Sequence, residues 1–418
     1  MAIGYACLTI GVPGTSISSC TLKNATEEHI RALIQKNLAA LNMILVYNIR
    51  QDIRLFRISS DLIPFGSHPV NIVEWQKDFH EYFVMLGEKI KQAGLRVSMH
   101  PGQYTVINSN NPEVVERSVQ ELIYHARFLD ALGVDCTNKL ILHIGGVYGD
   151  REKAIGNFIR EYLCLPQEVK RRLVIENDER CFNISEVLRI SERCGAPVVF
   201  DNLHHKINPP LERLSNDEWI KRCGLTWKSE DGRQKIHYSQ QKEQASPGSH
   251  SDTIYLQPFI EYYEQISITP PDIMLEVKDK NLSAIKCNHA VVKHSPAKCL
   301  EPEWARYKYY VLSKDAKAYQ EIRELLKDKE ARVSRVFYEM IERASTLPEN
   351  KGAEVNAAQH VWGYFSKDCT AVERKRYEKL IEAYTNGTAS ITSLKNHLLK
   401  CAFNHNQDYL IDSLYFYL

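Results

Sequence analysis

Short apolar runs alternate with longer segments of helical periodicity over about the first 285 residues, and this alternation restricts the fold more than any other feature of the chain. The apolar runs have a β-type composition and cover residues 2–8, 55–60, 95–100, 139–144, 172–177, 197–202, 234–239 and 272–277. The helical segments include residues 27–45, 72–94, 112–133 and 183–195, and the last three end in glycine, as helices often do. Eight strands in strand-then-helix order fit a (β/α)8 TIM barrel better than an open sheet.

The character of the chain changes after about residue 300, where strand-like runs disappear. Amphipathic helical patterns follow over residues 301–328, 331–345, 356–367 and 371–387. The sequence therefore predicts an α/β TIM-barrel domain over residues 1–300 and an all-helical domain over residues 301–418. A polar, turn-rich stretch at 238–252 predicts a long loop after the seventh strand.

The overall composition excludes some classes of protein. The net charge of +1 argues against a globally basic, non-specific nucleic-acid binder, so any such surface must be a local patch. The chain has eleven cysteines but no CxxC pair, which favours reduced thiols and a cytoplasmic location. It has no basic leader followed by an apolar stretch and no run of about 18 apolar residues, so we expect neither secretion nor membrane insertion.

Metal-compatible side chains recur at the carboxyl ends of the predicted strands. In a barrel these ends meet on one face, which carries the active site in this fold. The side chains gathered there are His68, His100, His143, Glu176, Asp201, His204, Lys235, His237, His250 and Glu276. Imidazoles and carboxylates without nearby thiols suit Zn, Mn or Fe in a catalytic rather than a structural site.

The number of candidate ligands exceeds what one ion can use, so we expect two or three ions that share carboxylates. Glu176 and Glu276 are the natural bridges, because a carboxylate has two oxygens and an imidazole has one free nitrogen. Ions about 3.5–4 Å apart can stabilise both the attacking and the leaving oxygen of a phosphodiester displacement. This ligand set therefore indicates phosphodiester chemistry.

Lys235 does not fit such a set if it is charged. It lies two residues before His237, so both side chains should point to the same face of the strand. Divalent cations would repel a protonated amine. We therefore expect Lys235 to be neutral, to be turned away, or to be converted by CO2 into an anionic carbamate.

Each of these residues also has an ordinary structural interpretation. A single histidine at a strand end is more often a packed core residue than a ligand, and Glu176 or Asp201 alone could be a helix N-cap. The joint pattern is more specific than its members, since strand after strand ends in a possible ligand. We assign no functional role to the remaining histidines, His29, His80, His125, His205, His289, His294, His360, His397 and His405.

Eight motifs, in their order along the chain, resemble the UV damage endonuclease family. They are "GYAC" (4–7), "FRISSDLIPFGSHP" (56–69), "MHPGQY" (99–104), "LILHIGG" (140–146), "VIEND" (174–178), "VFDNLHH" (199–205), "KIHYSQQ" (235–241) and "MLEVKDK" (274–280). The resemblance covers roughly residues 1–300 and implies a TIM barrel related to endonuclease IV. It implies incision of double-stranded DNA immediately 5′ to UV photoproducts, cyclobutane dimers and 6-4 photoproducts, leaving a 3′-hydroxyl and a 5′-phosphate. It also implies three divalent ions, with Mn2+ expected and Zn2+ or Co2+ possible, and no nucleotide cofactor.

The resemblance implies roles for individual residues. The first ion's ligands would be His100, His143 and Glu176. The second ion's would be Asp201, His237 and Glu276, with Glu176 shared. His204 and His250 would serve the third. The residues expected to act in catalysis are Glu176, His68, which would line the same pocket, and Lys235, which matches the family's modified lysine.

A second set of residues matches positions that probe the lesion in this family. Gln103 and Tyr104 correspond to residues inserted into the duplex at the damage, where a phenol ring can stack and an amide can replace lost base hydrogen bonds. Tyr5 and Thr9 correspond to the other probing positions, although the family often has Asn where this chain has Thr9. The ordinary alternative for Gln103 and Tyr104 is an exposed turn after a strand.

The segment 356–418 resembles a YbgA-type domain of unknown function. Its basic run of Arg374, Lys375, Arg376 and Lys379 could form a face near DNA, although such a run is usually a solvated helix surface.

Three alternatives to a UV damage endonuclease remain open from the sequence. A metal-dependent sugar isomerase would share His and Glu ligands at strand ends but has no use for a "GQY" wedge. An abasic-site endonuclease of the endonuclease IV type is the closer alternative. A non-enzymatic damage-binding module would need a closed structural site rather than so many ligands. We expect the protein to act on lesion-containing DNA as a monomer, without a membrane.

Overall fold

The computed structural model describes residues 1–266 and 270–418 and divides them into two compact units. The first comprises Met1–Thr9 and Gly14–Ile285, and the second comprises Ile10–Pro13 and Lys286–Leu418. The sequence placed the division at residue 300. No helix in the part of the chain that the structure describes is long and apolar enough to cross a membrane.

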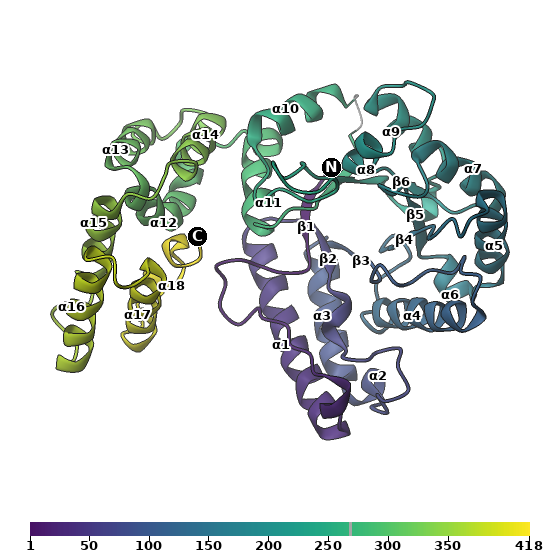
Figure 1. Ribbon diagram of the computed structural model, residues 1–418, viewed down its shortest axis with the longest axis horizontal. Coiled ribbons are helices and arrows are strands. Elements are labelled where there is room, and N and C mark those ends of the chain that lie inside the picture. Colours follow the sequence, from purple (N-terminus) through teal and green to yellow (C-terminus); the bar gives the residue numbers. More distant parts are fainter. Residues whose placement is uncertain (267–269) are drawn as a thin grey trace. The chain divides into compact units, whose positions relative to one another are not determined.

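The first unit is built on a barrel of parallel strands (Figure 1). In residues 1–266 and 270–418, eight strands form one sheet in the order β6-β5-β4-β3-β2-β1-β8-β7. Their bounds are β1 Ile3–Ala6, β2 Leu55–Ile58, β3 Arg96–Met99, β4 Leu140–His143, β5 Leu173–Glu176, β6 Val198–Val199, β7 Lys235–Tyr238 and β8 Asp272–Leu275. Each strand lies inside the run predicted for it, and the TIM-barrel prediction is confirmed.

The sheet closes between its terminal strands, β6 and β7, through a single parallel bridge that pairs Asp201 with His237. The backbone N–H of His237 donates to the carbonyl of Phe200 at 3.0 Å. Beyond the bridge, the side-chain amide of Asn202 continues the pairing: it donates to the carbonyl of Ser239 and accepts from the N–H of Ser239, at 3.0 and 2.8 Å. The closing contact of the barrel therefore lies at two of the predicted metal ligands.

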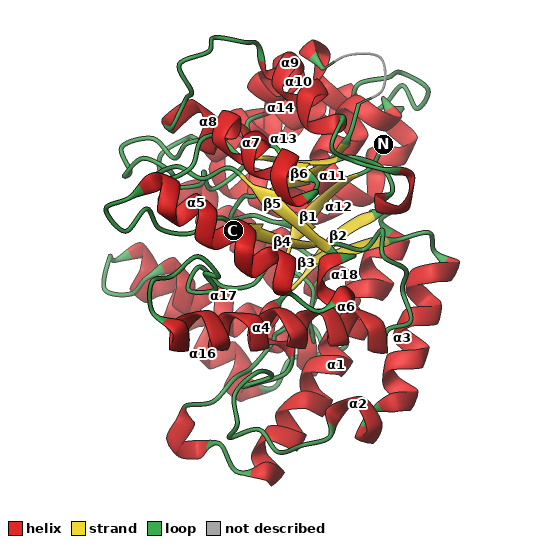
Figure 2. Ribbon diagram, turned by 90° about the vertical axis from the view of Figure 1, so that its right-hand side faces the viewer, coloured by secondary structure: helices red, strands yellow, loops and turns green. Residues whose placement is uncertain are grey.

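Helices surround the strands on the outside of the barrel (Figure 2). Their bounds are α1 Glu27–Arg50, α2 Trp75–Asp78, α3 His80–Gln92, α4 Pro112–Ala131, α5 Arg151–Cys164, α6 Gln167–Lys170, α7 Ile184–Cys194, α8 Asn202–Ile207, α9 Asn216–Gly224, α10 Leu256–Gln265 and α11 Asn281–Cys287. The glycines predicted to end three helices, Gly94, Gly133 and Gly195, adopt the left-handed conformation, with φ of 60°, 64° and 80°. The helix predicted over 72–94 is interrupted at Phe79, between α2 and α3.

The barrel interior is layered, because alternate residues of each strand point inward. At the amino ends of the strands, Arg96 pairs with Asp272 at 3.1 Å and Lys139 pairs with Asp231 at 2.5 Å. An apolar layer follows, formed by the buried residues Ala6, Leu55, Ile141, Val174, Val199 and Met274. Two residues beyond five of these positions lie Arg57, His143, Glu176, Asp201 and Glu276. The strand period therefore carries charged and imidazole side chains into one layer at the carboxyl end.

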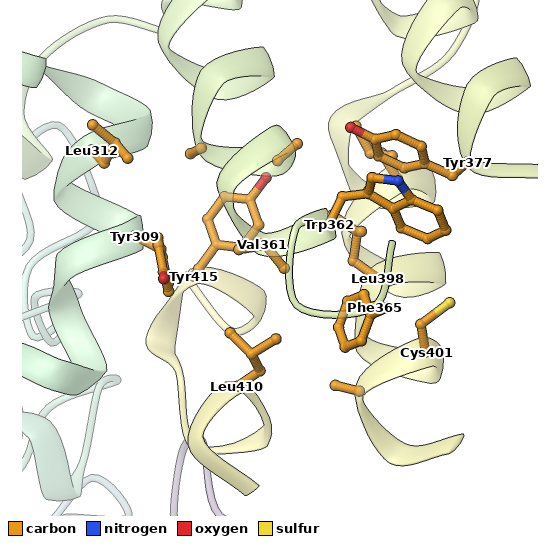
Figure 3. Packing of buried hydrophobic residues seen from close by; sticks show 14 residues of the cluster. Tyr309, Leu312, Val361, Trp362, Phe365, Tyr377, Leu398, Cys401, Leu410 and Tyr415 are labelled. Carbon is orange, nitrogen blue, oxygen red and sulfur yellow. The ribbon is translucent and has the colours of Figure 1, made fainter. Parts of the chain in front are cut away.

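The second unit is helical. Its helices are α12 Ala297–Lys314, α13 Ala316–Leu325, α14 Ser334–Ser345, α15 Lys351–Trp362, α16 Ala371–Thr385, α17 Ile391–Asn404 and α18 Asp408–Ile411. The segment predicted as one pattern over 301–328 is divided at Asp315, whose carboxylate caps α13. Figure 3 shows the core, in which the rings of Trp362 and Tyr377 lie face to face, with centroids 4.1 Å apart and planes at 7°. This contact attaches α16 to the end of α15.

Two helical glycines give a matched test of packing in the barrel unit. A Cβ added to Gly87 in α3 would overlap the carbonyl oxygen of Leu132 at the end of α4, whereas one added to Gly156 in α5 would meet open space. We expect Gly87→Ala to destabilise the protein by about 1–3 kcal/mol through overpacking. Gly156→Ala should stabilise it by about 0.5–1 kcal/mol through helix propensity. Urea denaturation of the two variants measures both effects, and equal shifts in the same direction would contradict the proposed packing.

Candidate metal centre

The carboxylate of Glu176, at the end of β5, lies at the centre of a cluster of imidazoles. The side chain is 1% exposed. Among the described residues, four histidines place a ring nitrogen within 4.0 Å of its oxygens: His237 at 2.7 Å, His100 at 3.3 Å, His143 at 3.7 Å and His204 at 4.0 Å. These residues come from the ends of β3, β4 and β7 and from α8. The structure thus brings together ligands that the sequence spreads over more than a hundred positions.

Two groups of side chains in the described part of the chain could each hold a metal ion. One is His100, His143 and Glu176, and the other is Glu176, Asp201 and His237, with the ligand atoms of each group within 4.8 Å of one another. Glu176 belongs to both, as expected for a bridging carboxylate. The first group matches the predicted set of the first ion, and the second contains three of the four residues predicted for the second ion.

Unsatisfied polar atoms support the fit of a metal. Among the described residues, Nδ1 of His143, Oδ2 of Asp201 and Nε2 of His237 are buried without a hydrogen-bond partner. A buried polar atom without a partner costs about 1–3 kcal/mol, and coordination would remove this cost. The donor set of imidazole nitrogen and carboxylate oxygen suits Mn, Zn or Co.

Neighbouring groups orient the histidines. Nδ1 of His100 donates to the carbonyl of Pro101, and Nδ1 of His204 donates to the carbonyl of Asn177, both at 2.9 Å. Each bond leaves the Nε2 lone pair free to bind a metal, which is the usual arrangement around a metal-bound histidine. The loop that carries His100 is held by Ser60, whose hydroxyl donates to the His100 carbonyl at 2.8 Å and lies 2.9 Å from Nε2 of His125. His125 thus contributes to the site indirectly, although the sequence assigned it no role.

Asn177 fixes the position of Asp201. Its side-chain amide donates to the carbonyl of Asp201 at 3.1 Å and accepts from the N–H of Asp201 at 2.9 Å. Asp201 combines the two roles considered from the sequence. One carboxylate oxygen accepts from the N–H of His204 at 2.7 Å and caps α8, and the other is the unsatisfied atom described above.

Glu276, at the end of β8, lies on the far side of His237. Its carboxylate is 3.3 Å from Nδ1 of His237 and 3.6 Å from Nε2 of His250, and it forms an ion pair with the buried guanidinium of Arg57. Arg57 was not predicted from the sequence. The signal was available, since Arg57 lies two residues after Leu55 on β2 and must therefore point into the barrel.

Electrostatics at the site favour the ligand forms of His143 and Glu176. Burial lowers the pKa of His143 to about 4, so its imidazole is neutral and has a lone pair to donate. Burial alone would raise the pKa of Glu176, but the adjacent rings of His237 and His143 hold it well below its usual range. Glu176 is therefore a carboxylate at neutral pH. Burial also lowers the pKa of Lys235 well below its ordinary value, which favours the neutral amine over the charged one.

Lys235 lies deeper in the barrel than the metal ligands. It pairs in register with Asp272 across β7 and β8, one inward position before His237, and is 1% exposed. Among the described residues, no carboxylate oxygen lies within 4.0 Å of its amine. Burial without a carboxylate partner disfavours a charged lysine at this position.

The remaining predicted residues lie outside the cluster. His68 is exposed, and its Nδ1 accepts from the N–H of Val70 at 3.1 Å. Gln103 and Tyr104 are exposed on the loop after β3, with Tyr104 84% exposed. His250 is partly exposed beside Glu276. These positions leave the side chains of Gln103 and Tyr104 available to a macromolecule.

Tyr5, which the family resemblance matched to a lesion-probing position, is packed inside the protein. Its side chain is fully buried, and its hydroxyl donates to Oδ1 of Asn48 at 2.7 Å and lies 3.1 Å from Oγ1 of Thr9. The reason is strand register: Ala6 points into the barrel, so Tyr5 points outward, where it packs on Phe56. In this position the Tyr5 hydroxyl hydrogen bonds to Thr9, and the Tyr5 side chain has no exposed surface.

Glu179 is a further residue that the sequence did not indicate. Its carboxylate lies 3.7 Å from Nε2 of His204, on the side away from Asp201. Burial alone would lower the pKa of His204, but the carboxylates of Asp201, Glu176, Glu276 and Glu179 raise it to about 9. Glu179 follows β5 by three residues, in the loop where strand-end reasoning no longer specifies direction.

Comparisons with known proteins agree on one family for the barrel. A sequence profile described as "UV-endonuclease UvdE" matches residues 2–295, and one described as "Protein of unknown function (DUF1722)" matches residues 308–418. A protein of Clostridium perfringens named UV DNA damage endonuclease is 44% identical over 332 residues, which cover 78% of this chain and 80% of that protein. One of Bacillus cereus (strain Q1) with the same name is 32% identical over 270 residues, 64% of this chain and 84% of that protein.

A solved structure shows the same fold. The crystal structure of SacUVDE matches with a TM-score of 0.66 and 37% sequence identity, over 70% of this chain and 98% of that chain. The match therefore includes nearly the whole of that protein.

The shared carboxylate makes a direct prediction about metal binding. Glu176→Gln removes a ligand from both groups, so we expect the dissociation constant for Mn2+ to rise by more than about 100-fold, the upper range for loss of a residue that only supports a ligand. Wild-type protein should gain about 2.7 kcal/mol of stability at a Mn2+ concentration 100 times the dissociation constant, and the variant should gain almost none. Equilibrium dialysis and thermal melting measure the two effects.

The control is Glu230→Gln, because Glu230 is an exposed carboxylate that precedes β7 at the opposite end of the barrel. It should bind Mn2+ as the wild type does. Retention of metal by Glu176→Gln would show that Glu176 is not the bridge.

Proposed function

The chain belongs to the UV-endonuclease UvdE family, and on this premise we propose that it incises double-stranded DNA immediately 5′ to UV photoproducts, leaving a 3′-hydroxyl and a 5′-phosphate. The observation that carries the proposal is the pair of possible ion sites joined by Glu176 at the carboxyl end of the barrel. Relatives named for UV DNA damage endonuclease activity support the choice of substrate. The proposed substrates are cyclobutane dimers and 6-4 photoproducts.

We further propose that three divalent ions, with Mn2+ as the physiological choice, occupy the centre. His100, His143 and Glu176 would hold one, Asp201, His237, Glu276 and Glu176 the second, and His204 with His250 the third. Divalent ions at such a centre supply Lewis-acid stabilisation of the charge that develops during phosphodiester displacement. Arg57 neutralises part of the charge on Glu276 and orients that carboxylate toward His237.

Residues of the loop after β3 are proposed to recognise the damage. An exposed phenol such as Tyr104 can stack where two bases have separated, and the neighbouring Gln103 amide can hydrogen bond to the unpaired bases. A damaged pair costs less to extrude than a normal pair, so lesions are selected by their weaker stacking. His100 lies in the same loop, three residues before Gln103, which would bring the recognised lesion close to the metal ligands.

Lys235 is proposed to act as a carbamate, or otherwise as a neutral amine. A neutral amine is the form that adds CO2: the nitrogen forms a bond to the carbon of CO2, and a proton is released. The burial that keeps Lys235 neutral therefore favours the carbamate predicted from the sequence. An anionic carbamate would also remove the electrostatic conflict between a lysine and bound cations. His68, which is exposed, is proposed to contact DNA rather than a metal.

A strand-cleavage assay tests the proposed reaction. A duplex with one defined thymine dimer should be nicked directly 5′ to the dimer with Mn2+, and chelator should abolish the nick. Glu176→Gln should lose the activity, and Glu230→Gln should retain it. Cleavage at an abasic site alone would instead support an abasic-site endonuclease, and cleavage of no DNA with any metal would refute the repair function.

Substitutions of Tyr104 and Tyr5 should distinguish an effect on lesion recognition from an effect on protein stability. Tyr104→Ala should change stability by less than about 0.5 kcal/mol, because the side chain is 84% exposed. It should lower lesion incision by about 5- to 150-fold, the range expected for loss of one base–aromatic stack. Tyr5→Phe should instead lower the free energy of unfolding by about 1–3 kcal/mol, because the Oδ1 of Asn48 loses its donor. It should change lesion incision little.

Incision kinetics and urea denaturation on the same two variants provide the measurement. If Tyr5→Phe lowered incision strongly without loss of stability, direct contact between Tyr5 and the lesion would be favoured over the supporting role inferred from its burial.

A further inference from the structure

The second unit contains a polar groove between α16 and α17. The groove has a volume of about 710 Å³. Its walls are formed by Thr370, Val372, Glu373 and Arg376 on one side and by Ser393, Asn396, His397, Lys400, Cys401 and Asn404 on the other. The residues from α17 recur at three- and four-residue steps, so they form one stripe along the helix. The groove therefore runs along the two helices rather than forming a closed pocket.

Two cations on the walls have no acidic partner. Arg376 and Lys400 are both exposed, and among the described residues no carboxylate oxygen lies within 4.0 Å of either. The acidic residue of the wall, Glu373, is already engaged: it accepts from Asn404 at 3.0 Å and from Thr370 at 2.9 Å, and it lies 3.2 Å from Nε2 of His405. Arg376 and Lys400 are thus available to a ligand, while the oxygens of Glu373 are already occupied by donors of the unit itself.

The helix that carries Arg376 is fixed in place yet widely exposed. α16 is attached by the stacking of Tyr377 on Trp362 and by the hydroxyl of Tyr384, which donates to Glu349 at 2.7 Å. Its exposed face carries Arg374, Lys375 and Lys379 beside the groove. Five exposed Lys and Arg side chains lie on α16 and α17, in a chain whose net charge is only +1: Arg374, Lys375, Arg376, Lys379 and Lys400. They are local basic residues of the kind that a nucleic-acid surface needs in a chain of this composition.

The chemistry of the walls indicates the occupant. The described residues of this unit contain no group of three ligands that could hold a metal. Phosphate oxygens, by contrast, accept from guanidinium, ammonium, hydroxyl and amide donors, all of which line the groove. DNA is the polyanion already implied by the family of the barrel.

We propose that the groove between α16 and α17 binds the phosphodiester backbone of DNA through Arg376 and Lys400, giving the protein a second contact with DNA besides the barrel. The inference rests on the proposed function in taking DNA as the polyanion. It assigns a role to a domain whose family description gives none. The contact is independent of sequence and of damage, because it is made to the backbone.

Salt dependence of DNA binding by the full-length protein tests the proposal. An undamaged duplex is titrated by fluorescence anisotropy at several salt concentrations with chelator present, so that neither cleavage nor lesion recognition contributes. Each phosphate contact adds about 0.9 to the slope of log K against log salt. The double variant Arg376→Gln, Lys400→Gln should therefore bind more weakly, with a slope shallower by about 2. Arg376→Lys, which keeps the charge, should retain the slope.

The matched control removes two charges elsewhere in the same unit, with Lys317→Gln and Lys327→Gln. Both lysines are exposed and pair with glutamates on or beside α13. The control should keep the wild-type slope. An unchanged slope in the groove variant, or an equal loss in the two double variants, would overturn the proposal.

The outcome can be separated from that of the proposed function, because the binding assay needs no incision. On a dimer-containing duplex, the groove variant should raise KM and leave kcat unchanged. A lowered kcat with unchanged KM would contradict a contact that serves only to bind the DNA backbone.

Discussion

Glu176 places one buried carboxylate within 4.0 Å of ring nitrogens from His100, His143, His204 and His237, and the upper end of the barrel is organised around that charge. A buried ion without a partner is strongly destabilising, by about 3–5 kcal/mol. The imidazoles can balance the charge only by binding protons, and burial opposes this at His143, whose pKa falls to about 4. Divalent cations balance it without protonating the rings. The same electrostatic demand therefore explains the buried carboxylate, the neutral imidazole and the unsatisfied nitrogen on His143.

Closure of the barrel determines the positions of these ligands. β6 has two residues, and its pairing with β7 is reduced to the bridge between Asp201 and His237. Asn177 and Asn202 complete the pairing with side-chain amides, which donate and accept as a backbone peptide would. Weak pairing between β6 and β7 would allow Asp201 and His237 to separate. Asn177, which follows β5, holds the backbone of Asp201, and Asn202 hydrogen bonds to Ser239, which follows β7. The barrel therefore closes and the metal ligands come together in the same step.

The sequence predicted the parts of the site that depend on strand period and chain order. Every strand lay inside its predicted run, and His100, His143, Glu176, Asp201 and His237 met because parallel strands end on one face. It did not predict residues whose role depends on a partner distant in the sequence. Arg57 matters because β2 and β8 flank the same strand, β1, so that Arg57 reaches Glu276, and Asn177 matters because β6 is short.

The outward direction of Tyr5 also followed from strand period, because Ala6 faces the barrel interior and its neighbour must face the helices. The family resemblance indicated a role for the position but carried no information about burial. The structure adds that Thr9 and Asn48 share the phenol hydroxyl. Motif matching identifies which residues belong to a site, and strand register decides which of them can reach a ligand.

The position of Lys235 completes the electrostatics of the barrel. Below it, the charges are compensated in pairs, with Arg96 against Asp272 and Lys139 against Asp231. Above it, the carboxylates of Glu176, Asp201 and Glu276 outnumber the cations, which are the guanidinium of Arg57 and the ring of His204 with its pKa of about 9, so the ligand layer is negative before metal binds. A charged lysine would reduce this negative potential and weaken the attraction for cations. Burial favours loss of that charge, because it lowers the pKa of Lys235 well below the ordinary value, and so preserves the negative potential that attracts metal ions.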